Sequence, residues 1–198
     1  MRLLIMGPPG AGKGTQAARV SEHYRIPAIS TGDIFRAMRT ADTPLARQVQ
    51  AIMASGGYVS DEVTNAIVKD RLGQADCDRG FLLDGYPRTV AQVDTLDQVL
   101  GERGHALHAV ISLLADVEEL VRRLLLRAAT DGRADDDEET IRVRQRVYAE
   151  QTAPLLDEYR RRGLLVEVDG LGAVDDVSER LFKALDGQSP GPATAPSA

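Results

Sequence analysis

Residues 7–15 read GPPGAGKGT and directly follow the apolar residues 3–6. Glycines let the backbone curl so that successive N–H groups point inward and form a nest for an anion. An amphipathic helical pattern follows, and the positive end of that helix adds to the attraction for phosphate. Lys13 can then reach the outer phosphates of a bound nucleotide as a mobile charge. Strand, glycine-rich turn, Gly-Lys and helix in this order predict a phosphate-binding loop.

The loop departs from the usual pattern at one position. Ser or Thr commonly follows the lysine and holds Mg²⁺, whereas this chain has Gly14 there and Thr15 one residue later. The shift weakens the case for direct ligation of the metal by a hydroxyl. Competing glycine motifs fail, because a GxGxxG pattern starting at Gly10 would need glycine where Thr15 stands. The HRD and DFG motifs of protein kinases and the NKxD motif of GTPases do not occur.

Composition limits the class of protein. The chain has 198 residues, 43% of them hydrophobic, which suits one domain with an ordinary core. A single cysteine, Cys77, excludes intrachain disulfides and a cysteine-based zinc site, and fits the reducing cytoplasm. No apolar stretch approaches about 18 residues, so we expect neither a signal peptide nor a membrane span. The net charge of −6 argues against general nucleic-acid binding, so phosphates must be met by a local arginine cluster.

Apolar runs alternate with helical patterns along most of the chain. Strands are predicted at residues 3–6, 27–29, 81–84, 109–114 and 164–168, and helices near 13–24, 61–73, 90–101, 116–128, 138–162 and 173–185. This alternation predicts right-handed βαβ units and a buried parallel sheet between two layers of helices, an α/β/α arrangement. Ligands in such folds bind at the carboxyl ends of the strands.

Three segments lie outside this alternation. Residues 31–60 carry two short helical patterns separated at Thr43-Pro44, which predicts an insert. Residues 129–136 form a short polar loop between two helical patterns, and both segments could act as covers. Residues 187–198 are rich in Pro, Gly, Ala and Ser, and are predicted to be a disordered tail.

Polar residues beside the predicted strand ends carry candidate chemistry. Asp84 ends an apolar strand near the phosphate loop, where a carboxylate orients Mg²⁺, here through water. Ser30-x-x-Asp33 and Thr89-x-x-Gln92 have the spacing of helix caps, and Asp33 can pair with Arg36 three residues later.

Five motifs in order, GPPGAGKGTQ, STGDIFR, FLLDGYPRT, GRADD and QTAPLLDEY, resemble those of adenylate kinases over residues 1–186. The resemblance implies a P-loop NTPase-type fold with a five-stranded parallel sheet. It implies one kinase domain with a core (1–29, 60–128 and 137–186), a small helical AMP-binding insert (30–59) and a short lid (129–136). It further implies Mg²⁺-dependent transfer from ATP to AMP. The short lid and the single cysteine exclude the zinc site found in the lids of some relatives. We expect a cytoplasmic protein, and a monomer is the default because the sequence does not indicate an oligomer.

The same resemblance assigns the nucleotide-binding residues. Thr31 would lie beside the AMP base, at a position where relatives that select pyrimidines tend to have alanine. Gln92 would form a hydrogen bond with adenine, which is an alternative to its role in capping a helix. Tyr58 stands where an aliphatic residue is common. The implied AMP site consists of Thr31, Arg36, Gly57, Tyr58, Val59, Gly85, Tyr86, Pro87, Arg88, Gln92, Arg133 and Arg144. The implied ATP site consists of Gly10, Ala11, Gly12, Lys13, Gly14, Thr15, Arg123, Arg127 and Gly172.

Helix geometry sorts the arginines independently. Arg123 has Glu119 four residues before it and could be a surface pair, whereas Arg127 has no acid at that spacing. Arg144 points about 200° away from Arg142, which belongs to a charge-paired ladder, so it can reach phosphate. The predicted catalytic set is Lys13, Asp84, Arg88, Arg127, Arg133 and Arg144.

Two other functions compete with AMP phosphorylation. A UMP/CMP kinase would share the fold, but Thr31 and Gln92 argue against it. A nucleotide-binding module without catalysis would have lost charges, yet Lys13, Asp84 and the proposed arginines are present.

Overall fold

A computed structural model describes residues 1–38, 41, 43–131 and 137–187, apart from the side chains of 117 and 127–131. It contains a five-stranded parallel sheet in the order β2-β3-β1-β4-β5. The strands are β1 (Arg2–Met6), β2 (Ala28–Ser30), β3 (Phe81–Asp84), β4 (Ala109–Leu114) and β5 (Leu165–Asp169). Since β1 is the central strand, the phosphate loop leaves the middle of the sheet. The predicted α/β class with five parallel strands is confirmed.

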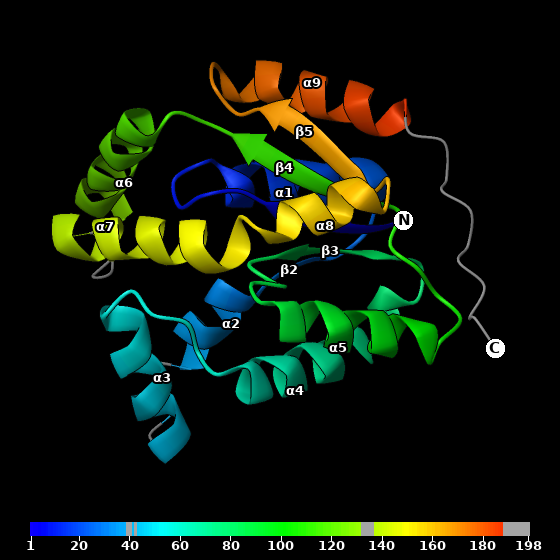
Figure 1. Cartoon of the computed structure of the whole chain (residues 1–198), viewed down its shortest axis with the longest axis horizontal. Coiled ribbons are helices and arrows are strands. Elements are labelled where there is room, and N and C mark those ends of the chain that lie inside the picture. The colour runs from blue at the N-terminus through cyan, green and yellow to red at the C-terminus, as the bar shows by residue number, and fades with distance from the viewer. Residues whose placement is uncertain (39–40, 42, 132–136, 188–198) are drawn as a thin grey trace.

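Helices cover both faces of the sheet (Figure 1). One face carries α1 (Lys13–Tyr24) and α9 (Val174–Asp186), and the other carries α4 (Asp61–Leu72), α5 (Val90–Gly101) and α8 (Leu155–Arg161). The reason is visible in β1, where Leu3 and Ile5 join the first core while Leu4 and Met6 join the second. Alternate side chains of a strand point to opposite faces, so the four consecutive apolar residues 3–6 of β1 need helices on both sides of the sheet.

Two short helices lie between β2 and α4, as the pattern of residues 31–60 predicts. They are α2 (Thr31–Ala37) and α3 (Pro44–Ala54). Thr43 caps α3 by accepting a hydrogen bond from the Ala46 N–H at 3.1 Å, and Pro44 occupies the first turn, where a missing N–H costs nothing. A small separate core holds this segment together through Phe35, Val49 and Val59.

The prediction of one helix over residues 138–162 is wrong. The segment divides into α7 (Glu138–Val147), a π-helical turn (Tyr148–Thr152) and α8. Pro154 causes the break, because proline has no N–H to donate and its ring clashes with the preceding turn.

Other boundaries differ by smaller amounts. Helix α6 (Val117–Asp131) runs past residue 128 into the predicted loop 129–136, of which residues 132–136 lie outside the described chain. Strands β1, β2 and β5 differ from their predicted limits by one residue. The tail beyond residue 187 also lies outside the described chain.

Candidate active site

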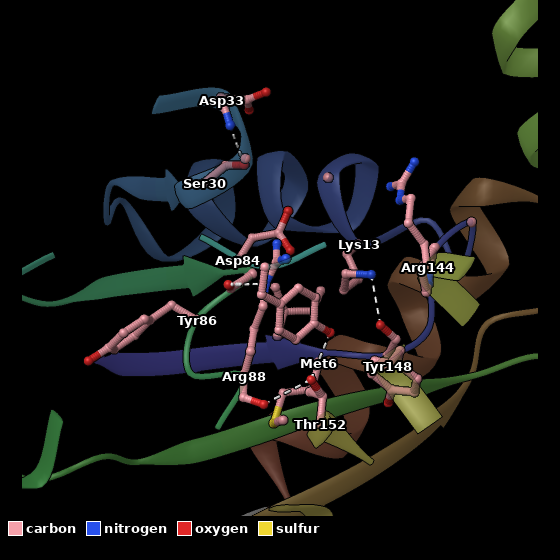
Figure 2. A pocket seen from close by; sticks show the side chains of 18 of the residues that line it. Met6, Lys13, Ser30, Asp33, Asp84, Tyr86, Arg88, Arg144, Tyr148 and Thr152 are labelled. Carbon is pink, nitrogen blue, oxygen red and sulfur yellow. Dashed lines mark hydrogen bonds between the residues drawn. The ribbon is translucent and has the colours of Figure 1, made fainter. Parts of the chain in front are cut away.

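The carboxyl ends of β1, β2 and β3 open onto a cavity of about 630 Å³. Figure 2 shows Lys13, Asp84, Arg88 and Arg144 gathered around this space, from three different segments of the chain: the start of α1, the end of β3 with the loop after it, and α7. Most predicted site residues line it, namely Gly10, residues 12–15, Arg36, residues 57–59, residues 84–88, Arg123 and Arg144. The cavity therefore brings the phosphate loop, the insert and the end of β3 to one place.

The phosphate loop is held closely against its surroundings. The Lys13 ammonium donates hydrogen bonds to the carbonyls of Gly7 at 2.8 Å and Pro8 at 3.0 Å. Gly10 has φ +89°, and a Cβ there would lie 2.9 Å from the Leu120 carbonyl oxygen of α6. Only glycine allows both this backbone conformation and this close approach.

Asp84 sits at the end of β3, in register with Ile5 of β1 and Ser30 of β2. Burial raises the pKa of its carboxyl, and the charges of Lys13 and Arg88 oppose that shift. Carboxylate oxygens are the hard ligands that Mg²⁺ prefers, so the residue suits a metal carried by a nucleotide. Among the described residues, no three His, Cys, Asp or Glu side chains cluster as a metal site would require.

Arg88 is partly buried and is held at its guanidinium. Its Nε donates to the Gly85 carbonyl at 2.7 Å, and its Cζ lies 4.6 Å from the ring centroid of Tyr58. Burial lowers the pKa of Arg88, with Tyr58 and Asp84 opposing the shift, and arginine remains charged at neutral pH. Within the described chain, Arg88 forms no ion pair with a carboxylate, so its charge is available to an anion.

Gly85 makes room for two predicted AMP ligands at once. Its φ is +79°, and an added Cβ would lie 2.8 Å from Thr31 Oγ1 and 2.9 Å from an Arg88 guanidinium nitrogen. Thr31, only 1% exposed, donates its hydroxyl proton to the Gly85 carbonyl at 2.9 Å. Thr31 therefore packs behind the cavity wall and does not line it.

Gln92 satisfies the capping pattern in part. Its N–H donates to the Thr89 hydroxyl at 3.3 Å, as a cap requires. Its side-chain oxygen accepts from the Arg88 N–H at 2.8 Å, and its side-chain nitrogen donates to Asp61 at 2.6 Å. The residue is 1% exposed and lies outside the cavity lining, so its contact with adenine stays a prediction.

The arginines separate much as helix geometry predicts. Arg123 pairs with Glu119 at 2.7 Å, and Arg122 and Arg123 together lower the pKa of Glu119 to about 2. Arg36 pairs with Asp33, and Arg142 pairs with Glu138 at 2.8 Å on the ladder, whereas Arg144 lines the cavity. The Arg127 side chain and all of Arg133 lie outside the described residues.

A second hollow of about 400 Å³ lies beside the phosphate loop. It is lined by Ala11, Thr15, Arg123, Gly170 and Gly172, among others. Ala11 and Gly172, which do not reach the main cavity, are thus brought together with other predicted ATP ligands.

Three residues of the site escaped sequence reasoning. Gln145 donates from its side chain to the Pro9 carbonyl of the loop at 2.9 Å, and Tyr148 and Thr152 line the main cavity. All three lie in the stretch treated as one continuous helix. Pro154 was the signal that could have drawn attention to this stretch.

A parallel sheet with this loop at its carboxyl edge and arginines facing it defines a P-loop nucleotide-binding protein. The family described as "Adenylate kinase" matches residues 5–164. Curated proteins named "Adenylate kinase" are 59% identical in Nocardioides sp. (94% of this chain, 97% of that protein) and 58% identical in Clavibacter michiganensis (98% and 96%). The chain belongs to the adenylate kinase family, and it is therefore a phosphotransferase of the nucleoside monophosphate kinase class. Nothing in these comparisons favours a UMP/CMP kinase or an inactive module.

Proposed function

We propose that the chain catalyses reversible transfer of a phosphoryl group from ATP to AMP, giving two ADP. AMP binds in the main cavity, and ATP lies along the phosphate loop with its base toward the second hollow. The observation that carries this assignment is Arg88, a charged and partly buried guanidinium facing the cavity with no ion pair inside the described chain. A phosphate dianion would bind this guanidinium through charge-assisted hydrogen bonds.

The residues act by positioning and by charge stabilisation, which dominate phosphoryl transfer. Lys13 and the loop N–H groups hold the donor phosphates, while Arg36 and Arg88 hold the acceptor phosphate. Arg144, with Arg123, Arg127 and Arg133, surrounds the transferring group with preoriented positive charge. No general base is needed, because the attacking phosphate of AMP is already anionic.

Asp84 would hold Mg²⁺ through water molecules. Its carboxylate supplies hard oxygen donors, and the position of Thr15, one residue later than usual, is consistent with water-mediated holding. When bound, the metal neutralises charge on the phosphates. Members of this family use ATP, generally with Mg²⁺.

We further propose that residues 30–59 and 129–136 act as covers over a core of 1–29, 60–128 and 137–186, with no catalytic role for 187–198. Covers are needed because water in the site would hydrolyse ATP. The protein would work as a cytoplasmic monomer, with nucleotides and no nucleic acid or membrane as partners. No helix in the described parts of the chain is long and apolar enough to cross a membrane.

The test is a coupled assay of ADP formation with Mg-ATP and, in parallel, AMP, dAMP, UMP, CMP or GMP. Turnover confined to AMP and dAMP is expected. Rapid turnover of UMP or CMP would keep the mechanism but overturn the acceptor. Absence of turnover with all five would overturn the proposal.

A further inference from the structure

Tyr58 lies on the segment that joins α3 to α4. It lines the main cavity, and its ring and its hydroxyl both contact other residues of the chain. The ring faces the Arg88 guanidinium at 4.6 Å, and the hydroxyl lies 2.9 Å from Thr152 Oγ1. These contacts join the insert to two parts of the core that are far away in the sequence.

The direction of the hydroxyl bond follows from proton counting. Thr152 Oγ1 donates to the backbone carbonyl of Arg88 at 3.0 Å, a bond visible in Figure 2. A threonine hydroxyl has one proton, so Thr152 must accept from Tyr58. Thr152 is 5% exposed and ends the π-helical turn, a type of irregularity frequent at functional sites.

Arg88 is consequently fixed at both ends. Its carbonyl is bound by the Tyr58–Thr152 pair, its guanidinium lies on the Tyr58 ring, and its Nε is bound by Gly85. An arginine ordered in advance loses less side-chain freedom when it binds an anion. The aromatic ring stabilises the cation and leaves its charge in place, whereas a carboxylate would neutralise it.

We propose that Tyr58 is a positioning residue, which holds the Arg88 guanidinium ready for the acceptor phosphate. The proposal rests on the proposed function, in which Arg88 binds the phosphate of AMP. A simpler role, in which Tyr58 only contacts the AMP base, makes a different prediction. It leaves Arg88 undisturbed when the ring is removed.

The decisive variants are Tyr58→Leu, which removes ring and hydroxyl, and Tyr58→Phe, which removes the hydroxyl alone. For Tyr58→Leu we expect the KM for AMP to rise about tenfold and the KM for ATP to stay nearly unchanged, the scale of one partly desolvated cation–π contact. Tyr58→Phe should recover most of this loss. Thr152→Val should add little to Tyr58→Phe, because both break the same bond.

A spectroscopic readout separates positioning from a general structural role. The {¹H}–¹⁵N heteronuclear NOE of the Arg88 Nε–Hε signal in the nucleotide-free protein should fall in Tyr58→Leu, because the guanidinium becomes more mobile, and stay close to wild type in Tyr58→Phe. The signal is assigned by its loss in Arg88→Lys. The matched control is Tyr24→Leu, since Tyr24 bonds Asp186 on the surface at 3.1 Å and lies outside the cavity lining. It should change neither the signal nor the KM for AMP.

The two proposals fail in different ways. An unchanged heteronuclear NOE of Arg88 in Tyr58→Leu overturns the positioning role, even where the KM for AMP rises. If wild-type protein does not turn over AMP, the proposed function fails, while the Arg88 signal still decides whether Tyr58 orders the arginine. Thermal unfolding of each variant verifies that the chain is folded in the assay.

Discussion

Gly85→Ala is the substitution that most directly tests how the acceptor site is built. The added methyl would sit 2.8 Å from Thr31 Oγ1 and 2.9 Å from the Arg88 guanidinium, on a backbone with φ +79°. Two separate costs are expected. One is backbone strain, which acts on stability, and the other is displacement of Arg88, which acts on AMP binding and transfer.

Both costs can be sized. A left-handed conformation costs an L-residue roughly 1–2 kcal/mol, which lowers the Tm of a chain of this length by roughly 2–8 °C. Restoring ordinary contact distances requires the neighbours to move by about 0.5 Å, judged against the 3.4 Å onset of normal packing. Misplacement of about 1 Å can cost about 10²-fold in rate, so we expect kcat/KM for AMP to fall on the order of tenfold to a hundredfold.

Gly104→Ala is the matched control. Gly104 also has positive φ, +65°, but an added Cβ there meets nothing within 4 Å. It should lose a similar amount of Tm and keep the wild-type kcat/KM. If Gly85→Ala also keeps wild-type kinetics with AMP, then Gly85 does not set the position of Arg88, and the reasoning is refuted.

Three further substitutions test other parts of the site and the core. Lys13→Met should lower kcat about 10²–10³-fold, the scale of losing one preorganised charge contact, and steady-state assays with saturating ATP would check it. Asp84→Asn should lose Mg²⁺-dependent turnover, and retained turnover would contradict the role of Asp84. The same variant should keep the wild-type Tm at pH 7, because burial raises the pKa of this carboxyl and so makes its charged form costly. Burial, with the N-terminal ammonium and Arg2, lowers the pKa of His108, whose Nδ1 accepts from the Arg2 N–H at 3.0 Å. Its stabilising effect is therefore present above the unfolded pKa of about 6.5 and is lost as pH falls through the lower folded value. Between pH 7 and 5 the Tm of the wild type should fall more than that of His108→Asn; parallel curves would exclude this.

Local patterns predicted the parts of the fold that local physics decides. The apolar residues 3–6 of β1 require helices on both faces of the sheet, and the glycine loop requires a following helix. Apart from the strand order, both features could be predicted from residues 3–24. Arg123 and Arg144 could be assigned because helical spacing alone fixes which face each occupies. The break at Tyr148–Thr152 does not show in the helical spacing of residues 138–162, and the local signal for it is Pro154, which has no N–H to donate.

Contacts between distant segments could not be predicted in this way. Two interpretations of Gln92 stayed open, as a cap or as an adenine ligand, and spacing could not decide between them. The structure shows that its amide is bound to Asp61, which is 31 residues away, and to the Arg88 N–H. These two hydrogen bonds of the Gln92 side chain hold the loop that carries Arg88. Gln92 therefore supports the arginine of the acceptor site even without contacting a base. The same holds for Tyr58 and Thr152, which lie 94 residues apart and meet at Arg88. A phosphate-binding arginine is recognisable in a motif, but the residues that order it are recruited from wherever the sheet and its helices bring the chain together.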